Sequence, residues 1–310
     1  MADDGGTRRT VLVAGAANVF VGAIKLAAGI MTGSSAMLAE AAHSAADTLN
    51  QGFLLASLHR ARRSADSRHP FGYGQERYFW SLLAAFGIFI AGAGFSVFEG
   101  VMSLTRPVKG DILIAFLALA LAGIAEGASF VRAFIQLRRE AMDAGESTGQ
   151  HARTSPDTTL RTALFEDSTA VIGLALAALG LTLQVVTGSP VWDGAASICI
   201  GGLLVVVAVR LGLDSRDYLI GKAAGPQELD TICAVIEATP GVDEILDLRT
   251  MHLGPDQLIV AARVAFSDRI SADNAEDAAD DIDRRICDQL PITTHVFLDP
   301  TQAPAEKARK

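Results

Sequence analysis

Cysteine is scarce in this chain of 310 residues, and its three copies form no pattern. Cys199, Cys233 and Cys287 stand apart and include no CxxC pair. An odd number of isolated cysteines argues against a disulfide framework and a cysteine-rich zinc site. It is typical of a protein in a reducing compartment.

Charged residues are also few. They make up 20% of the chain against 50% hydrophobic residues, and the mean hydropathy of +0.32 is too high for an ordinary soluble enzyme. The net charge is −9, with acidic residues gathered in 276–283, so we expect no nucleic-acid partner. The sequence also lacks a nucleophile elbow and an HExxH motif, which argues against a hydrolase.

What the sequence does contain is long apolar runs. Crossing about 30 Å of hydrocarbon takes about 20 residues in a helix. Six runs meet this length, and we predict an α-helical membrane protein with six transmembrane helices, the first of them uncleaved. They lie near 11–31, 35–58, 79–104, 111–135, 159–186 and 191–213.

Arginine divides the loops into two classes. Arginines precede the first span, follow the second and separate the fourth from the fifth, whereas the opposite loops carry only Arg106 and Lys109. By the positive-inside rule both termini are cytoplasmic. We expect the chain in the cell (inner) membrane.

The composition becomes polar after Leu213, so we expect a transmembrane domain over 1–213 and a cytoplasmic domain over 214–310. Helical spacing in 229–236 precedes two β-rich segments separated by a turn at 254–256. An acidic-to-basic helix and a last strand follow. The order αββαβ predicts a small α+β domain, ferredoxin-like, with both helices on one face of the sheet.

The second span carries a polar stripe in an otherwise apolar helix. Its members are three or four residues apart and therefore share one helix face: Glu40, His43, Asp47 and Asn50. An ionisable group near the bilayer centre costs about 2.5–3.5 kcal/mol even on insertion scales, so it must face protein, water or an ion. His43 and Asp47, at i and i+4, can bind one cation from the same side.

The fifth span supplies further carboxylates, Glu166 and Asp167. Counting about 1.5 Å per residue places His43 about 12 Å from the outer face and Asp167 about 12 Å from the inner face, so both lie near the midplane. Adjacent side chains diverge by about 100°, so we favour Asp167 as the ligand. Glu166 is either a fourth ligand or a group that orients the others.

One histidine with two or three carboxylates suits zinc first, with manganese, iron or cobalt as alternatives. A competing interpretation is that His43 and Asp47 hydrogen-bond each other and join helices. For Glu40, a solvated position at the rim is equally compatible with the sequence. Glu126 stands alone in the fourth span and is better explained by a helix cap or an interhelical hydrogen bond.

Three stretches resemble the cation diffusion facilitator family: NVFVGAIKLAAGIMTGSSAMLAEAAHSAADTLNQ, HPFGYGQERYFW and FEDSTAVIG. The resemblance implies a homodimeric divalent metal exporter, not an enzyme, in which protons move against the metal. It places the metal motif of the second span on His43 and Asp47. The metal is then the transported substrate rather than a resident cofactor.

The sequence departs from this family at two places. Matching the family's aspartate on the fifth span to Asp167 puts Ala163 where His or Asp usually stands, so the chain resembles the subgroup with an acidic Glu-Asp pair, Glu166 and Asp167. In the tail only Asp299 agrees with the family's metal-binding positions. His252 and His295 are therefore expected to be ordinary strand residues, in a tail that dimerises.

The function expected from these residues is zinc efflux in exchange for protons, because imidazole exchanges a proton for a metal near neutral pH. Two rivals remain from the sequence alone: a membrane-embedded metalloenzyme and a scaffold without transport. A measurement of metal accumulation distinguishes the transporter from both rivals, because neither rival moves ions.

Overall fold

The structure is a computed structural model whose described residues fall into two units. One unit comprises Met1–Leu55 with Leu83–Gly212, and the other Ala56–Leu82 with Leu213–Lys310. The residues that the structure describes are 4–61, 63–106, 110–143, 145, 147–149, 158–267, 271–290 and 292–301.

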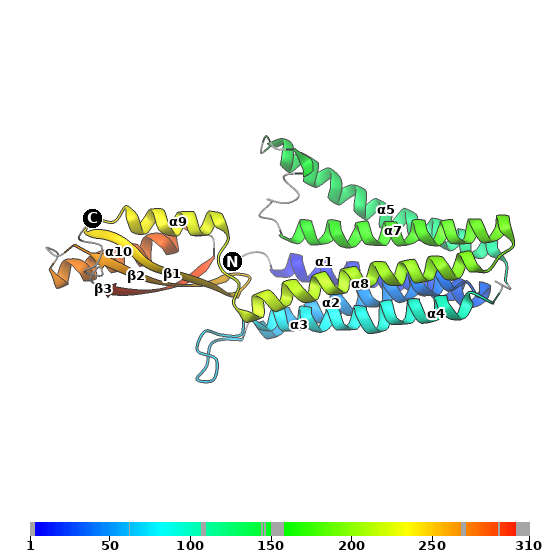
Figure 1. Ribbon diagram of the computed structural model, residues 1–310, viewed down its shortest axis with the longest axis horizontal. Helices are drawn as coiled ribbons and strands as arrows, with labels where there is room; N and C mark the ends of the chain where they lie inside the picture. Colours follow the sequence, from blue (N-terminus) through cyan, green and yellow to red (C-terminus); the bar gives the residue numbers. More distant parts are fainter. Residues whose placement is uncertain are drawn as a thin grey trace, which may run out of the picture. The chain divides into compact units, whose positions relative to one another are not determined.

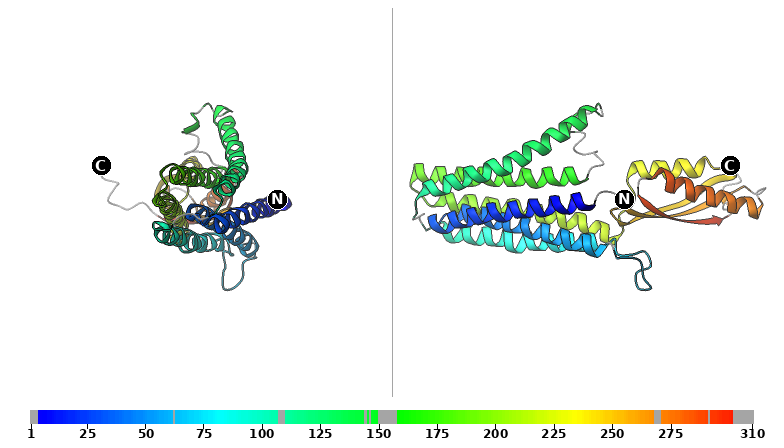
Figure 2. Two further views of the ribbon diagram at one scale, coloured as in Figure 1. Left: turned by 90° about the vertical axis from the view of Figure 1, so that its right-hand side faces the viewer. Right: turned by 180° about the vertical axis from the view of Figure 1, so that it is seen from behind.

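Long helices build the first unit (Figure 1). They are α1 (Asp4–Thr32), α2 (Ser35–Ala61), a continuous helix formed by α3 (Glu76–Gly87), η1 (Ile88–Gly94) and α4 (Phe95–Ser103), then α5 (Ile112–Asp143), α7 (Thr158–Thr187) and α8 (Val191–Ile220). α5 packs against α1 and α7, and the views in Figure 2 place it on the opposite side of this bundle from α4.

This is a multi-pass membrane protein. Within the described part of the chain, four helical segments are long and apolar enough to cross a bilayer, namely Glu76–Ser103, Ile112–Met142, Leu164–Thr187 and Val191–Ile220. α1 contributes a shorter apolar stretch, Asn18–Thr32. α2 is not among the four, and its polar stripe lowers its hydropathy. The count of six spans therefore stays a prediction for the first two helices.

Two helices run past the apolar segments from which they were predicted. α5 continues to Asp143, eight residues beyond its predicted span, and α8 to Ile220, seven residues beyond. Both extensions are rich in charge, and hydropathy alone cannot detect them, because a helix keeps its backbone hydrogen bonds after it leaves the hydrocarbon.

Small residues bring the third helix and α8 close together. A Cβ added at Gly100 would lie 2.8 Å from the carbonyl oxygen of Gly194, and one at Gly201 would lie 2.6 Å from Cγ2 of Val97. Such close approach is how helices associate in a membrane, where the hydrophobic effect offers no driving force. The π-helical turn η1 lies just before this contact, and Ser96 Oγ donates to the Gly92 carbonyl there at 2.8 Å.

A buried carboxylate joins the start of α2 to the start of α8. Asp193, 1% exposed, accepts hydrogen bonds from Ser34 Oγ at 2.6 Å and from the backbone nitrogen and Oγ of Ser35 at 2.6 and 2.8 Å. It thus caps α2 from another helix, where an anion also complements the helix dipole. The contact fixes the height of α2 beside α8.

We predict that Asp193→Ala lowers the stability of the helical unit by about 2 to 3 kcal/mol, because hydrogen bonds to a charged group are lost and the donors of α2 stay buried. The thermal unfolding midpoint in detergent measures the loss. Asp214→Ala, at an exposed position on the same helix, is the control and should leave the midpoint unchanged. Equal midpoints for both variants would contradict a capping role.

The second unit contains the predicted αββαβ order. The elements of this order are α9 (Pro226–Glu237), β1 (Val242–Gly254), β2 (Gln257–Phe266), α10 (Ala272–Gln289) and β3 (Thr293–Thr301). The sheet order is β1-β2-β3, with β1 antiparallel to β2 as the predicted hairpin and β3 parallel to β2. Both helices share one apolar core with the sheet, contributed by Ile232 and Ile236 of α9, Ile282 and Ile286 of α10, and Leu258 and Val260 of β2.

Candidate metal centre between the membrane helices

His43 and Asp47 lie one turn apart on α2. Their Nε2 and Oδ2 atoms are 3.6 Å apart, longer than a hydrogen bond, and the His43 side chain is 5% exposed. Among the described residues neither ring nitrogen of His43 has a hydrogen-bond partner. This geometry does not match the alternative in which the pair bonds to itself, and it leaves an imidazole lone pair available.

The acidic pair on α7 contacts two different helices. Asn50 Nδ2 of α2 donates to Glu166 Oε1 at 3.0 Å, and Ser129 Oγ of α5 donates to Asp167 Oδ2 at 2.8 Å. The side chains diverge as expected for adjacent residues on a helix. Asp47 is close enough to interact electrostatically with both carboxylates. We call these five residues, Asp47, Asn50, Ser129, Glu166 and Asp167, the α2–α7 polar layer.

The relative height of α2 and α7 differs from the one predicted by counting residues. Glu166 lies opposite Asn50, and Gly173 lies against Glu40. Asp47 is thus opposite the acidic pair, and His43 lies one turn nearer Glu40 instead of level with Asp167. The cause is at the helix ends. Asp193, in the first turn of α8, holds the start of α2 at Ser35, and Gly180 of α7 lies against the neighbouring Trp192. The last residues of α7 therefore run on beyond the start of α2.

No three His, Cys, Asp or Glu side chains are spaced to hold a metal ion among the residues that the structure describes. The four predicted ligands, His43, Asp47, Glu166 and Asp167, are therefore brought to neighbouring levels of facing helices, but not to coordination distance. Zinc ligands lie about 2.0–2.2 Å from the metal when they are oxygen or nitrogen. Binding a metal here requires side chains of α2 and α7 to turn inward.

Sequence reasoning missed Lys25. Its ammonium, 0% exposed on α1, donates to Glu40 Oε2 at 2.8 Å and to Glu126 Oε1 at 2.6 Å. Glu40 is fully buried, so the rim position considered for it is wrong, and the interhelical bond expected for Glu126 is present. A lysine inside an apolar run was the available signal, since such a charge needs a partner.

Asp299, which agrees with a family metal-binding position, and the two histidines of the tail contact other residues of the second unit. Asp299 Oδ2 accepts from Arg263 Nε at 3.1 Å, and the ring of His295 contacts Phe71 edge-on with centroids 5.9 Å apart. His252 Nε2 lies 3.7 Å from Glu228 Oε2 of α9. Each of the three therefore has a structural partner in the second unit.

Burial lowers the pKa of His252 below its usual value, against the attraction of Glu228. The unfolded chain therefore binds the His252 proton more tightly than the folded chain does. As the pH falls below the unfolded pKa of about 6.5, protonation of His252 lowers the free energy of unfolding of the second unit.

We predict that Glu228→Gln lowers the pKa of His252 further, because the negative charge that raises this pKa is removed. NMR titration of ¹³C-labelled histidine in the full chain measures it. Glu237→Gln, at an exposed position on the same helix, should not move the His252 titration.

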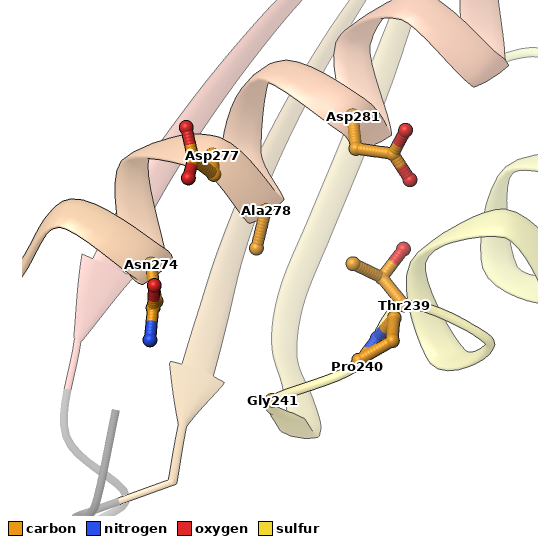
Figure 3. Close-up of a pocket in the computed structure, with 7 residues that line it drawn as sticks. All are labelled: Thr239, Pro240, Gly241, Asn274, Asp277, Ala278 and Asp281. Atoms are coloured by element: carbon orange, nitrogen blue, oxygen red, sulfur yellow. The ribbon is translucent and has the colours of Figure 1, made fainter. Parts of the chain in front are cut away.

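A pocket of about 410 Å³ lies in the second unit between the end of α9 and α10 (Figure 3). Asp281, one of its carboxylates, is already paired with Arg285 at 3.5 Å. The pocket contains none of the predicted ligands. Its lining is Thr239, Pro240, Gly241, Asn274, Asp277, Ala278 and Asp281.

A bundle of apolar helices with acidic side chains and a histidine between them, followed in the chain by a small mixed sheet, defines a multi-pass membrane protein with ionisable side chains inside its helical bundle, as ion pathways have them. Residues 11–220 match the model of the cation efflux transmembrane domain, and residues 224–300 match that of the cytoplasmic domain of cation efflux proteins. The chain belongs to the cation efflux, or cation diffusion facilitator, family.

Several characterised proteins resemble the chain along most of its length. A mouse protein named proton-coupled zinc antiporter SLC30A9, mitochondrial, is 34% identical over 86% of this chain and 47% of its own length. Metal tolerance protein C4 of Arabidopsis thaliana is 32% identical over 88% and 60%, and magnetosome protein MamB of Paramagnetospirillum magneticum is 28% identical over 91% and 89%. The chain thus spans about half the length of the mouse relative.

Proposed function

We propose that this protein moves a divalent metal cation across a membrane, zinc first, in exchange for protons. The observation that carries the proposal is the α2–α7 polar layer, which sets three carboxylates between apolar helices with His43 one turn away. Three carboxylates that lie close together between apolar helices repel one another and are costly to ionise, and a small divalent ion offsets that cost. The printed name of the mouse relative supports zinc and protons as the exchanged ions.

The metal ligands in this proposal are His43, Asp47 and Asp167, with Glu166 as the fourth ligand or as the group that orients them. A site between helices that can shift binds an ion with few ligands and releases it on the other side. Neutral imidazole and ionised carboxylates bind the metal, and the same groups take up protons when it leaves. Manganese, iron and cobalt remain alternative substrates because the ligand types do not separate them from zinc.

The remaining parts of the proposal concern assembly and location. We assign both termini and the second unit to the cytoplasm from the arginine distribution, and the protein to the cell (inner) membrane. On this orientation the metal leaves the cytoplasm. We further propose a homodimer, supported by the match of residues 224–300 to the cytoplasmic domain of cation efflux proteins.

The test is zinc uptake into proteoliposomes that enclose a fluorescent zinc indicator, with a proton gradient imposed across the membrane. We expect zinc entry that requires the protein and stops when an ionophore collapses the gradient. Parallel assays with manganese, iron and cobalt rank the substrates. If none of the four metals enters, transport of these metals is excluded. That result would favour the scaffold hypothesis, and it would also be compatible with a metalloenzyme, which accumulates no metal.

A further inference from the structure

Lys25, Glu40 and Glu126 form a charged cluster inside the helical unit, which we call the Lys25 network. The three residues come from α1, α2 and α5, and the side chains of Lys25 and Glu40 are 0% exposed, with Glu126 at 15%. Taking three charges out of water costs several kcal/mol per ion, and their mutual attraction only partly offsets this cost. A network of this kind is weak evidence for a role in stability alone.

The Lys25 network leaves ligand atoms unused. One ammonium faces two carboxylates, and Glu40 Oε1 and Glu126 Oε2 have no hydrogen-bond partner within the described parts of the chain. Glu40 Oε1 points at Gly173 of α7, where any side chain would collide with it. His43, with both ring nitrogens also unpaired, is close enough to Glu126 to interact electrostatically.

These unused atoms are the types that bind zinc. Zinc is bound in proteins by histidine nitrogens and by carboxylate oxygens, and the metal–oxygen distances are about 2.0–2.2 Å. The other oxygen of each carboxylate, the one that Lys25 holds, already converges on one point, because Lys25 Nζ lies 2.8 Å from Glu40 Oε2 and 2.6 Å from Glu126 Oε1. A divalent ion in place of the ammonium would need each of these oxygens to move inward by less than about 1 Å, which a change in the glutamate side-chain torsions can supply.

We infer that Lys25 is a built-in counter-cation that occupies Glu40 and Glu126 in place of a divalent ion, so that metal binds only at the α2–α7 polar layer. This inference rests on the proposed function. Glu40 lies on the Ser35 side of His43 along α2, which is the predicted outer end. A zinc ion leaving the polar layer outward would otherwise meet a second buried site and stop there.

The test is zinc binding by the purified full-length protein in detergent, measured by equilibrium dialysis with metal counting. Four proteins are compared: wild type, Asp47→Ala, and Asp47→Ala combined with Lys25→Met or with Lys25→Arg. Methionine keeps the length of lysine without its charge, and arginine keeps the charge. We expect Asp47→Ala to weaken zinc binding at least about tenfold, because even the loss of a residue that only orients a metal ligand costs roughly 10- to 100-fold. Adding Lys25→Met restores binding, and adding Lys25→Arg does not.

A folded Asp47→Ala/Lys25→Met protein that still binds no zinc overturns the inference. One that folds only when zinc is supplied supports it, because the metal then replaces the lost ammonium. If this variant does not fold at all, Glu40→Gln and Glu126→Gln in the wild-type chain decide the question. Both should keep the wild-type zinc stoichiometry, since Lys25 already occupies these carboxylates, and a lower stoichiometry in either would make them ligands and overturn the inference.

The two proposals fail in different ways. A wild-type protein that binds no zinc contradicts the proposed function, while zinc bound by the Asp47→Ala/Lys25→Met protein would still identify Lys25 as the counter-cation. Conversely, normal wild-type binding with no gain in the double variant leaves the proposed function intact and removes the role of Lys25.

Discussion

Replacing Asp47 with alanine is expected to abolish proton-driven zinc uptake into proteoliposomes. Asp47 lies opposite Glu166 and Asp167, and its Oδ2 is 3.6 Å from His43 Nε2, so this carboxylate interacts with both the acidic pair and the imidazole. The loss of Asp47 removes one ligand. The remaining ligands, His43 on one side and the acidic pair on the other, lie about one helix turn apart along the bundle. The expected decrease exceeds the roughly 10- to 100-fold that loss of a merely orienting partner costs at metal sites.

Two variants serve as controls for this result. Ser129→Ala removes the hydrogen bond to Asp167 Oδ2 without removing a charge, and we expect it to slow uptake by roughly 10- to 100-fold without abolishing it. Asp214→Ala removes an exposed carboxylate on α8 and should leave uptake unchanged. Uptake by Asp47→Ala at the rate of the Asp214→Ala protein would place the metal path elsewhere in the bundle.

The second unit was predictable from the sequence in its order of elements but not in its detail. Periodicity changes from helical to alternating near Val242, and the turn at 254–256 predicts a hairpin, which the structure contains. The pairing of β1 with β2 also shifts register between Val242 and Glu244 and again between Ile245 and Asp247. Such irregularities depend on cross-strand packing, which no local pattern records.

The candidate site was predictable only within single helices. A period of about 3.6 residues places His43 and Asp47 on one face of α2, and apolar surroundings mark Glu166 and Asp167 on α7. Which faces meet depends on helix packing. Lys25 reaches Glu40 across 15 positions and Glu126 across 101 positions in the sequence, and the end of α7 runs past the start of α2. Counting residues from each helix end assumes that the ends are level, and here they are not.

The acidic pair on α7 gives the second large effect, because its two members should respond differently to loss of charge. We expect Asp167→Asn to abolish zinc binding and uptake, since it removes the ligand that sequence reasoning favours. Glu166→Gln should reduce affinity by roughly 10- to 100-fold and keep transport, because glutamine retains the Oε1 that accepts from Asn50. Zinc affinity by equilibrium dialysis and uptake rate in proteoliposomes are measured on the same preparations.

The contact of each carboxylate decides how a reversed result is interpreted. Glu166 bonds to α2, the helix of His43 and Asp47, whereas Asp167 bonds to Ser129 on α5. If Glu166→Gln abolishes binding while Asp167→Asn keeps it, the ion is held between α2 and Glu166, and Asp167 only joins α7 to α5. Asn50→Ala tests independently which carboxylate holds the ion. It should weaken zinc binding if Asn50 positions Glu166 as a ligand. It should leave zinc binding unchanged if Asp167 alone of the acidic pair holds the metal.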